Sequence, residues 1–210
     1  MGLDIYFYKV KNYDGRNDWS EVHEFMEDQN REEVKKVYDG VIKSLSRAKD
    51  YDKAYARVIK RLANMFSFPE YDLKPLGVEY DYQTGKYSYT PVDLSTLLKE
   101  EDRIIKNAYR KEDAYFRKVN FIYAYFQNKL VEEEAWVTRE DLEDLIDKCE
   151  KILADHSLAE ELLPTQSGFF FGSTDYDDWY FSDVKSCLKQ MTKLLKELKD
   201  DEQIFVSMSW

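Results

Sequence analysis

The sequence predicts an α+β fold, namely a mainly helical single domain with a small antiparallel sheet that joins the N- and C-terminal strands. Three observations support this prediction. Both ends of the chain, LDIYFYKV at 3–10 and QIFVSMSW at 203–210, are rich in β-branched and aromatic residues, as strands are. Most segments between them repeat apolar residues every three or four positions, as helices do. Residues 78–90 show the pattern of a β-hairpin.

The N-terminal third contains one strand and two helices. A turn is expected at 12–17, where Asp14-Gly15 follows the first strand. Apolar residues then recur with helical spacing from Trp19 to Phe66, and Asp50-Tyr51-Asp52 divides the region into two helices.

The middle of the chain contains the hairpin and two further helices. Pro69 and Pro75 bracket a loop, and tyrosines then alternate with polar residues on both sides of Thr84-Gly85. A helix is expected from Asp93 to Arg110. Another is expected from Asp113 to about Leu130, with Val119, Ile122, Tyr123 and Phe126 on one face.

Two long helices and a strand complete the chain. Thr138 can cap a helix whose apolar stripe runs from Leu142 to Leu153, and a last helix spans about 182–198. Because a lone strand exposes unpaired backbone groups, we expect the two terminal strands to pair, with Ile5 and Phe7 beside Phe205 or Val206. We treat residues 1–210 as one domain, in which 19–110 is a candidate insertion.

Composition limits the classes of partner. The chain has 210 residues, 31 basic and 42 acidic, for a net charge of −11. Direct binding to DNA or RNA needs a basic surface, so we expect none. An acidic surface keeps a protein soluble, and it can also meet a basic partner. The oligomeric state, a homo-oligomer included, stays open.

The compartment predicted is the cytosol. Cys149 and Cys187 both lie in amphipathic helical patterns, which predicts buried, reduced thiols. No apolar run approaches the roughly 18 residues of a membrane span, and the opening MGLDIY lacks the basic and apolar regions of a signal peptide.

Familiar catalytic patterns are absent from the sequence. His23 and His156 are the only histidines, and neither lies in a zinc-binding motif. The sequence also contains no P-loop, no dinucleotide-binding glycine motif and no nucleophile elbow. We therefore predict no catalytic residue, no cofactor and no metal, although a magnesium site assembled from distant carboxylates stays open.

The stretch LLPTQSGFFFGSTDYDDWYF is the first candidate binding segment. Gly168 and Gly172 flank three phenylalanines, at least one of which must point away from the core if the segment is extended. Flat apolar rings beside hydroxyl and amide groups are typical of small-molecule pockets. The alternative is a rigid core loop whose polar groups cap helices. The candidate ligand-binding residues are Thr165, Gln166, Ser167, Phe169, Phe171, Thr174, Tyr176, Trp179 and Tyr180.

The second candidate is YFRKVNFIYAYF, at 115–126. If this segment is helical, Asn120 and Tyr123 share a stripe, and Arg117 and Lys118 flank it. Two cations beside an amide and aromatic rings suit a phosphate or a carboxylate. The alternative is a helix whose basic residues pair with the surrounding acids.

Five segments together resemble a family of bacteriophage and prophage proteins. They are MGLDIYFY, FRKVNFIYAYF, VTREDLEDLIDKCEKIL, LLPTQSGFFFGSTDYDDWYF and the closing VSMSW, in that order. Members of the family typically begin MGLDMYL, carry a WRKAN-like helix followed by a histidine, and end in Ser-Trp. This chain has Phe116, Val119 and Tyr123 where the tryptophan, alanine and histidine usually stand. The resemblance implies a phage context more than an activity, and the missing imidazole argues against catalysis.

The preferred hypothesis is a non-enzymatic phage protein that binds and sequesters a small anionic ligand, such as a cyclic oligonucleotide immune signal, in the host cytosol. Aromatic rings would stack on bases, and Arg117 and Lys118 would meet phosphates. One alternative is an acidic protein-interaction inhibitor of a host nucleic-acid-binding or defence protein. Another is a metal-dependent phosphodiesterase or nuclease. The binding hypothesis requires the 115–126 and 164–180 segments to meet in space.

Overall fold

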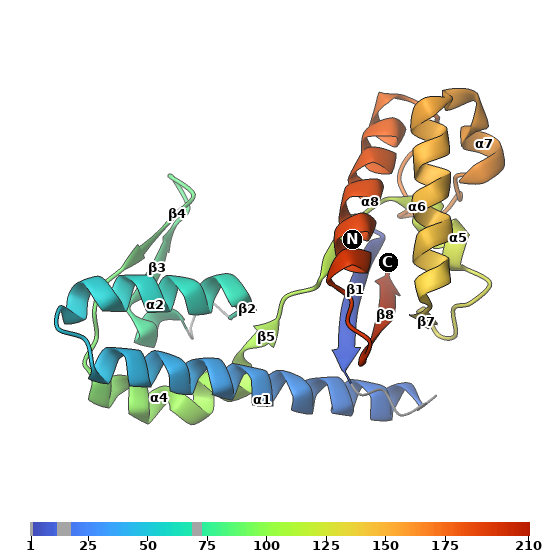
Figure 1. The fold of residues 1–210 in the computed structure, drawn as a ribbon. Coiled ribbons are helices and arrows are strands. Elements are labelled where there is room, and N and C mark those ends of the chain that lie inside the picture. Colours follow the sequence, from blue (N-terminus) through green and yellow to red (C-terminus); the bar gives the residue numbers. More distant parts are fainter. Residues whose placement is uncertain (1, 12–17, 69–72) are drawn as a thin grey trace. The chain divides into compact units, whose positions relative to one another are not determined.

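The computed structural model describes residues 2–11, 18–68 and 73–210 (Figure 1). The chain divides into two compact units. The terminal unit combines Met1–Trp19 with Glu112–Trp210, and the inserted unit is Ser20–Lys111. The inserted unit begins and ends within one residue of the candidate insertion 19–110. The turn expected at 12–17 and Pro69 lie outside the described residues.

A four-stranded antiparallel sheet forms the centre of the terminal unit, in the order β6-β1-β8-β7. Its strands are β1 (Asp4–Lys11), β6 (Ala114–Arg117), β7 (Glu134–Val137) and β8 (Glu202–Ser209). The terminal strands pair from Asp4 opposite Ser209 to Lys11 opposite Glu202, so the predicted pairing and the α+β class are confirmed. Phe7 lies opposite Val206, as expected, whereas Phe205 lies on the other face, against the rings of Trp19 and Trp136.

Helices α6 (Arg139–Ala154) and α8 (Asp178–Glu197) pack against each other and against one face of this sheet. The shorter elements are α5 (Asn120–Phe126), η2 (His156–Leu158) and α7 (Ala159–Leu162). Inward-facing residues of the sheet join apolar residues of α5, α6 and α8 in one core. Cys149 and Cys187 are free and buried in this core, which confirms the prediction for the thiols.

Side-chain caps start both long helices of the terminal unit. The hydroxyl of Thr138 accepts from the Asp141 N–H, and the Asp141 carboxylate accepts from the Thr138 N–H, which forms a capping box. The Asp177 carboxylate accepts from the Trp179 and Tyr180 N–H groups, so α8 starts four residues before the predicted Ser182.

The elements of the inserted unit are α1 (Trp19–Ser46, whose first residue belongs to the terminal unit), α2 (Tyr51–Met65), β2 (Phe66–Ser67), η1 (Lys74–Leu76), β3 (Val78–Asp81), β4 (Lys86–Tyr89), α4 (Leu94–Asn107) and β5 (Tyr109–Arg110). In the described residues of the inserted unit, the helices α1, α2 and α4 pack around a core of their own. The predicted break is confirmed, because Asp50 caps α2. The predicted hairpin is β3–β4. The buried Tyr38 and Tyr55 donate their hydroxyls to the carbonyls of Leu97 and Leu76, so neither hydroxyl lacks a partner.

The helix predicted from Asp113 to about Leu130 is confirmed only from Asn120 to Phe126. Residues Ala114–Arg117 form β6, and helix begins again only at Asn120. Ala114 and Phe116 face the core while Tyr115 and Arg117 face outward. The side chains therefore alternate with the period of two that is typical of a strand, and not with the helical period of the prediction. Between β6 and α5, Lys118 adopts a left-handed backbone conformation with φ +60°. The predicted helix 93–110 also ends earlier, at Asn107, and Tyr109–Arg110 pairs with β2.

Candidate functional site

The structure brings the two predicted binding segments together within the terminal unit. Leu3, just before β1, connects them through its backbone. Its N–H donates to the Phe170 carbonyl at 3.0 Å, and its carbonyl accepts from the Lys118 N–H at 2.7 Å. The glycine-flanked loop at 163–177 therefore lies beside the turn that carries Arg117 and Lys118.

Asn120 holds this loop in place. Its side-chain amide donates to the Phe171 carbonyl at 3.2 Å and to the Ser173 carbonyl at 2.8 Å. Its side-chain oxygen accepts from the Gln166 N–H at 3.3 Å. Asn120 is almost fully buried, so three hydrogen bonds at the start of α5 satisfy loop groups that would otherwise lack partners. Its role is to position the loop.

The two glycines allow the loop to fold tightly. Gly172 has φ +92°, and a Cβ there would lie 3.2 Å from the Lys118 carbonyl oxygen. A Cβ on Gly168 would lie 2.6 Å from the Phe171 ring, closer than atoms approach without movement. Both positions therefore need glycine, the first for its conformation and the second for space.

The three phenylalanines have different environments. The Phe171 ring is buried and contacts the rings of Tyr123, at 4.8 Å between centroids, and Trp210, at 5.4 Å. Tyr123 and Trp210 also contact each other at 5.3 Å, which closes an aromatic triad. Phe169 is 94% exposed, and its ring contacts that of its neighbour Phe170 edge to face, at 4.7 Å. One phenylalanine thus anchors the loop and another is presented to solvent.

Most of the remaining candidate residues hold the loop itself. Thr165 donates its hydroxyl to the Thr174 carbonyl at 3.0 Å, and its N–H donates to the Tyr176 hydroxyl at 3.3 Å. Tyr180 is buried, donates its hydroxyl to the Leu163 carbonyl, and has its pKa raised by burial. These contacts indicate a rigid loop, as the alternative expects, but these polar groups bond within the segment instead of capping a helix.

Four predicted residues of the loop segment remain accessible for a ligand or a partner. They are Ser167, Phe169 and Thr174 in the loop, and Trp179, 80% exposed, in the first turn of α8. Gln166 is only partly exposed, and its side-chain amide lies 3.4 Å from the Ser167 carbonyl.

Arg117 and Lys118 form an exposed basic pair next to the loop. A Cβ on Gly2 would lie 3.1 Å from Lys118 Cε and 3.5 Å from Arg117 Nε, so both cationic side chains converge over Gly2. Arg117 Nε lies 3.9 Å from the Asp4 carboxylate, whereas Lys118 forms no ion pair with any residue that the structure describes. The left-handed backbone costs a lysine roughly 1–2 kcal/mol, and the contacts with Leu3 and Gly172 hold it there.

Sequence reasoning missed the residues on the outer face of the sheet beside Arg117. The Tyr115 hydroxyl donates to Asp4, and this bond, followed by desolvation, raises the pKa of Tyr115 to about 12. The Tyr115 ring lies 5.1 Å from that of Tyr6, which lies 6.5 Å from that of Tyr8. The alternation of Tyr6 and Tyr8 with apolar residues was the available signal, since it places both on the outer face.

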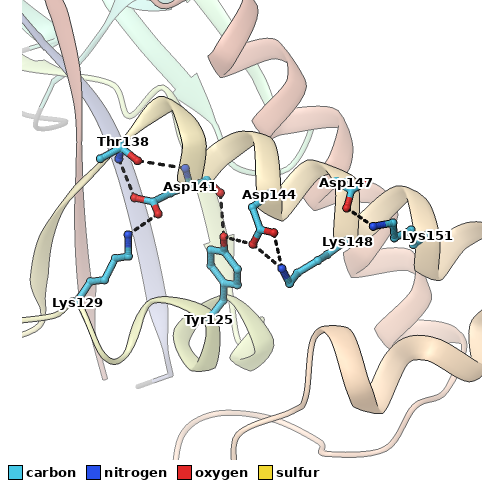
Figure 2. A network of polar contacts seen from close by, with 8 residues as sticks. All are labelled: Tyr125, Lys129, Thr138, Asp141, Asp144, Asp147, Lys148 and Lys151. Carbon is cyan, nitrogen blue, oxygen red and sulfur yellow. Dashed lines mark hydrogen bonds and ion pairs between the residues drawn. The ribbon is translucent and has the colours of Figure 1, made fainter.

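A second polar network ties α5 to α6 (Figure 2). The Tyr125 hydroxyl donates to the Asp141 carbonyl at 3.0 Å and to the Asp144 carboxylate at 2.6 Å. Lysines pair with each aspartate of the network, namely Lys129 with Asp141, Lys148 with Asp144 and Lys151 with Asp147. Its charges balance, and we read it as a structural clamp.

Neither a metal site nor a membrane span is evident in the described part of the chain. Within residues 2–11, 18–68 and 73–210, no group of three or more His, Cys, Asp or Glu residues is placed to hold a metal ion. The helices of these same residues include none with both the length and the apolar character needed to cross a bilayer.

Comparison with known proteins adds no further information about the site. No protein-family model, no curated protein and no solved structure matches this chain. The chemistry of the site must therefore be inferred from its own residues.

Proposed function

We propose that this protein binds a small anionic ligand that carries a flat ring, such as a nucleotide or a cyclic oligonucleotide, and sequesters it without chemical change. The observation that carries the proposal is the placement of Arg117 and Lys118 beside the exposed aromatic tip of the loop, connected through Leu3. In a chain of charge −11, this pair is a local basic spot.

Different residues of the site bind different parts of the ligand. Arg117 and Lys118 meet the phosphates, since a guanidinium can bind phosphate oxygens in a bidentate manner and an ammonium acts as a point charge. Phe169 offers a ring face on which a base can stack, worth roughly 1–3 kcal/mol per base. Asn120, Phe171 and the two glycines keep the loop rigid, which lowers the entropic cost of binding.

The setting that we propose is phage infection. The sequence resemblance supports a phage origin, and a phage protein that captures a cyclic oligonucleotide immune signal in the host cytosol would blunt host defence. Sequestration needs binding alone, which agrees with the lack of a recognisable catalytic motif in the sequence.

Calorimetric titration with a panel of mononucleotides and cyclic di- and trinucleotides tests the proposal. At least one member should bind, and Phe169→Ala and Lys118→Gly should each weaken that binding about tenfold or more. Glycine accepts φ +60° and removes the cation, so Lys118→Gly changes the charge without straining the turn. Lys196→Ala, an exposed lysine on α8, is the matched control. Background heat for the whole panel, or full binding by both variants, would contradict the proposal.

A second candidate is a protein-interaction inhibitor, which the exposure of Phe169 and Trp179 favours. Aromatic residues that stand out from a rigid surface are frequent hot spots of protein interfaces. This candidate predicts a stable complex with a host protein and no heat with nucleotides. Phe169→Ala should break that complex, whereas Arg117→Ala should leave it intact.

A further inference from the structure

The charge of the chain is unevenly distributed between its two units. The segment Ser20–Lys111 contains 17 basic and 17 acidic residues, so the whole net charge of −11 belongs to the rest of the chain. An average over all residues therefore hides the electrostatics of the inserted unit. Its basic residues are also concentrated, with seven between residues 43 and 61, where only Asp50 and Asp52 are acidic.

Four of these cations line one face of α2. Lys53, Arg57, Lys60 and Arg61 follow a spacing of four, three and one residues, and all four are exposed. The opposite face, which contains Ala54, Tyr55, Ile59 and Leu62, is buried in the core of the unit. Lys43, Arg47 and Lys49, at the α1–α2 corner, are exposed as well. We call the four α2 residues the basic stripe.

The charges of the basic stripe are not neutralised by neighbouring acidic side chains of the described residues. None of its four residues forms an ion pair with a residue of the described ranges. Asp52 is the only carboxylate on α2, and Asp50 is engaged in capping the helix, where it accepts from the Lys53 N–H. The stripe extends over about 12 Å, given the 1.5 Å rise per helical residue. A line of unpaired cations of this length fits several phosphates in a row.

An anionic membrane surface is a poorer match for this helix. Helices that lie on membranes insert their apolar face among the lipids. The apolar face of α2 already packs against α1, η1 and α4 residues in the core. The helix can therefore offer only its charged face to a partner.

Exposed aromatic rings accompany the stripe in the same unit. Strand β4 of the hairpin contacts α2. The Tyr80 ring lies 5.0 Å from that of Tyr82 and 4.8 Å from that of Tyr87, and Tyr82 and Tyr87 are 74% and 52% exposed. Basic grooves combined with accessible aromatic rings are the features by which proteins hold unpaired bases and their backbone.

We infer that the inserted unit binds single-stranded nucleic acid, with the basic stripe on the phosphates and the hairpin tyrosines stacked on bases. This site differs from the Arg117–Lys118 site, and it does not depend on the function proposed there. It also replaces the expectation, based on net charge, that the chain does not contact DNA or RNA directly.

Fluorescence anisotropy of the full chain with labelled oligonucleotides of about 20 nucleotides tests the inference. If the four cations of the basic stripe neutralise four phosphates, a plot of log affinity against log salt concentration should have a slope near −2.8. The affinity should then fall about 50-fold between 50 and 200 mM salt. The double variant Lys53→Ala/Arg57→Ala should halve this slope. Lys189→Ala/Lys193→Ala on α8 removes two equally spaced, exposed lysines from the other unit and should leave binding unchanged.

The tyrosines require a separate variant pair. Tyr87→Ala should weaken single-strand binding about tenfold or more without changing the salt slope, whereas Tyr87→Phe should retain it. Several outcomes would overturn the inference. They are no binding at 50 mM salt, equal loss in the α8 control, tighter binding of a duplex of the same length, or stripe-dependent binding to vesicles of anionic lipid.

Discussion

Replacing Asn120 should loosen the loop at 163–177 and destabilise the terminal unit. In Asn120→Ala, the carbonyls of Phe171 and Ser173 and the N–H of Gln166 lose their partner at once. Each hydrogen bond is worth about 1 kcal/mol net, and groups left buried without partners add to the loss. We therefore expect the free energy of unfolding to fall by about 2–4 kcal/mol.

Urea denaturation followed by tryptophan fluorescence measures this effect in the relevant unit. All four tryptophans of the chain, Trp19, Trp136, Trp179 and Trp210, belong to the terminal unit, so the signal reports its unfolding. With a typical dependence of about 2 kcal/mol per molar urea, the midpoint should fall by roughly 1–2 M. Hydrogen exchange of the 165–174 backbone should become faster in the same variant.

Two further variants separate hydrogen bonding from packing. Asn120→Asp keeps the shape and the acceptor, but it replaces the donor with an oxygen that faces two carbonyls, so it should be at least as damaging as alanine at neutral pH. Asn128→Ala changes an exposed asparagine just after α5 and should shift the midpoint little. If Asn120→Asp unfolds like the wild type, the hydrogen bonds to the loop contribute no stability and the reasoning fails.

Four other substitutions should have measurable effects. Gly172→Ala should cost about 1–2 kcal/mol by the same urea assay, because φ is +92° and the Lys118 carbonyl is close. Gly40→Ala, in an open part of α1, should instead raise the thermal midpoint of the inserted unit, and equal effects of the two would contradict this. Tyr125→Phe should cost about 1 kcal/mol. Asp144 has a pKa held below 3.8 by Lys148 and Tyr125, so the part of the wild-type advantage that comes from the ionised carboxylate should be complete above pH 3.8 and be lost as pH falls through the lowered pKa. An advantage that does not decrease in acid would refute it. The Tyr115 pKa is raised to about 12 by its hydrogen bond to Asp4, so this contact should stabilise fully below pH 10 and be lost as pH rises through 12. In Tyr115→Phe, the urea midpoint should therefore fall less steeply at alkaline pH than in the wild type. If the two proteins show the same alkaline dependence, the contact contributes nothing to stability.

Local signals in the sequence were sufficient for several elements. The break at Asp50-Tyr51-Asp52, the cap at Thr138, the hairpin turn and the pairing of the terminal strands all follow from short motifs or from the cost of an unpaired strand. The prediction for 114–126 was wrong in part, because the apolar residues of this segment fit both the strand period of two and the helical period. Ala114 and Phe116 fit a strand, Ile122 and Phe126 fit a helix, and only the pairing with β1 fixes where one ends.

The candidate site shows the same division between local and long-range information. Composition identified the Gly-Phe-Phe-Phe-Gly loop and the Arg117–Lys118 pair, but it could not distinguish the buried Phe171 from the exposed Phe169. Nor could it show that Asn120 holds the loop, since its partners lie 46 to 53 residues away. Net charge also hides a contrast within the chain, because the sum of −11 does not show that the inserted unit is electrically neutral.

The strand order has a consequence for biosynthesis. The sheet places β8 between β1 and β7, so strands from near both termini must meet at its centre. During translation, nearly two hundred residues must be synthesised after β1 before its partner β8 emerges from the ribosome. The 20–111 segment has a hydrophobic core of its own, so it can become compact in that interval. An interrupted or slowed ribosome would therefore release a finished helical insertion attached to an unclosed sheet.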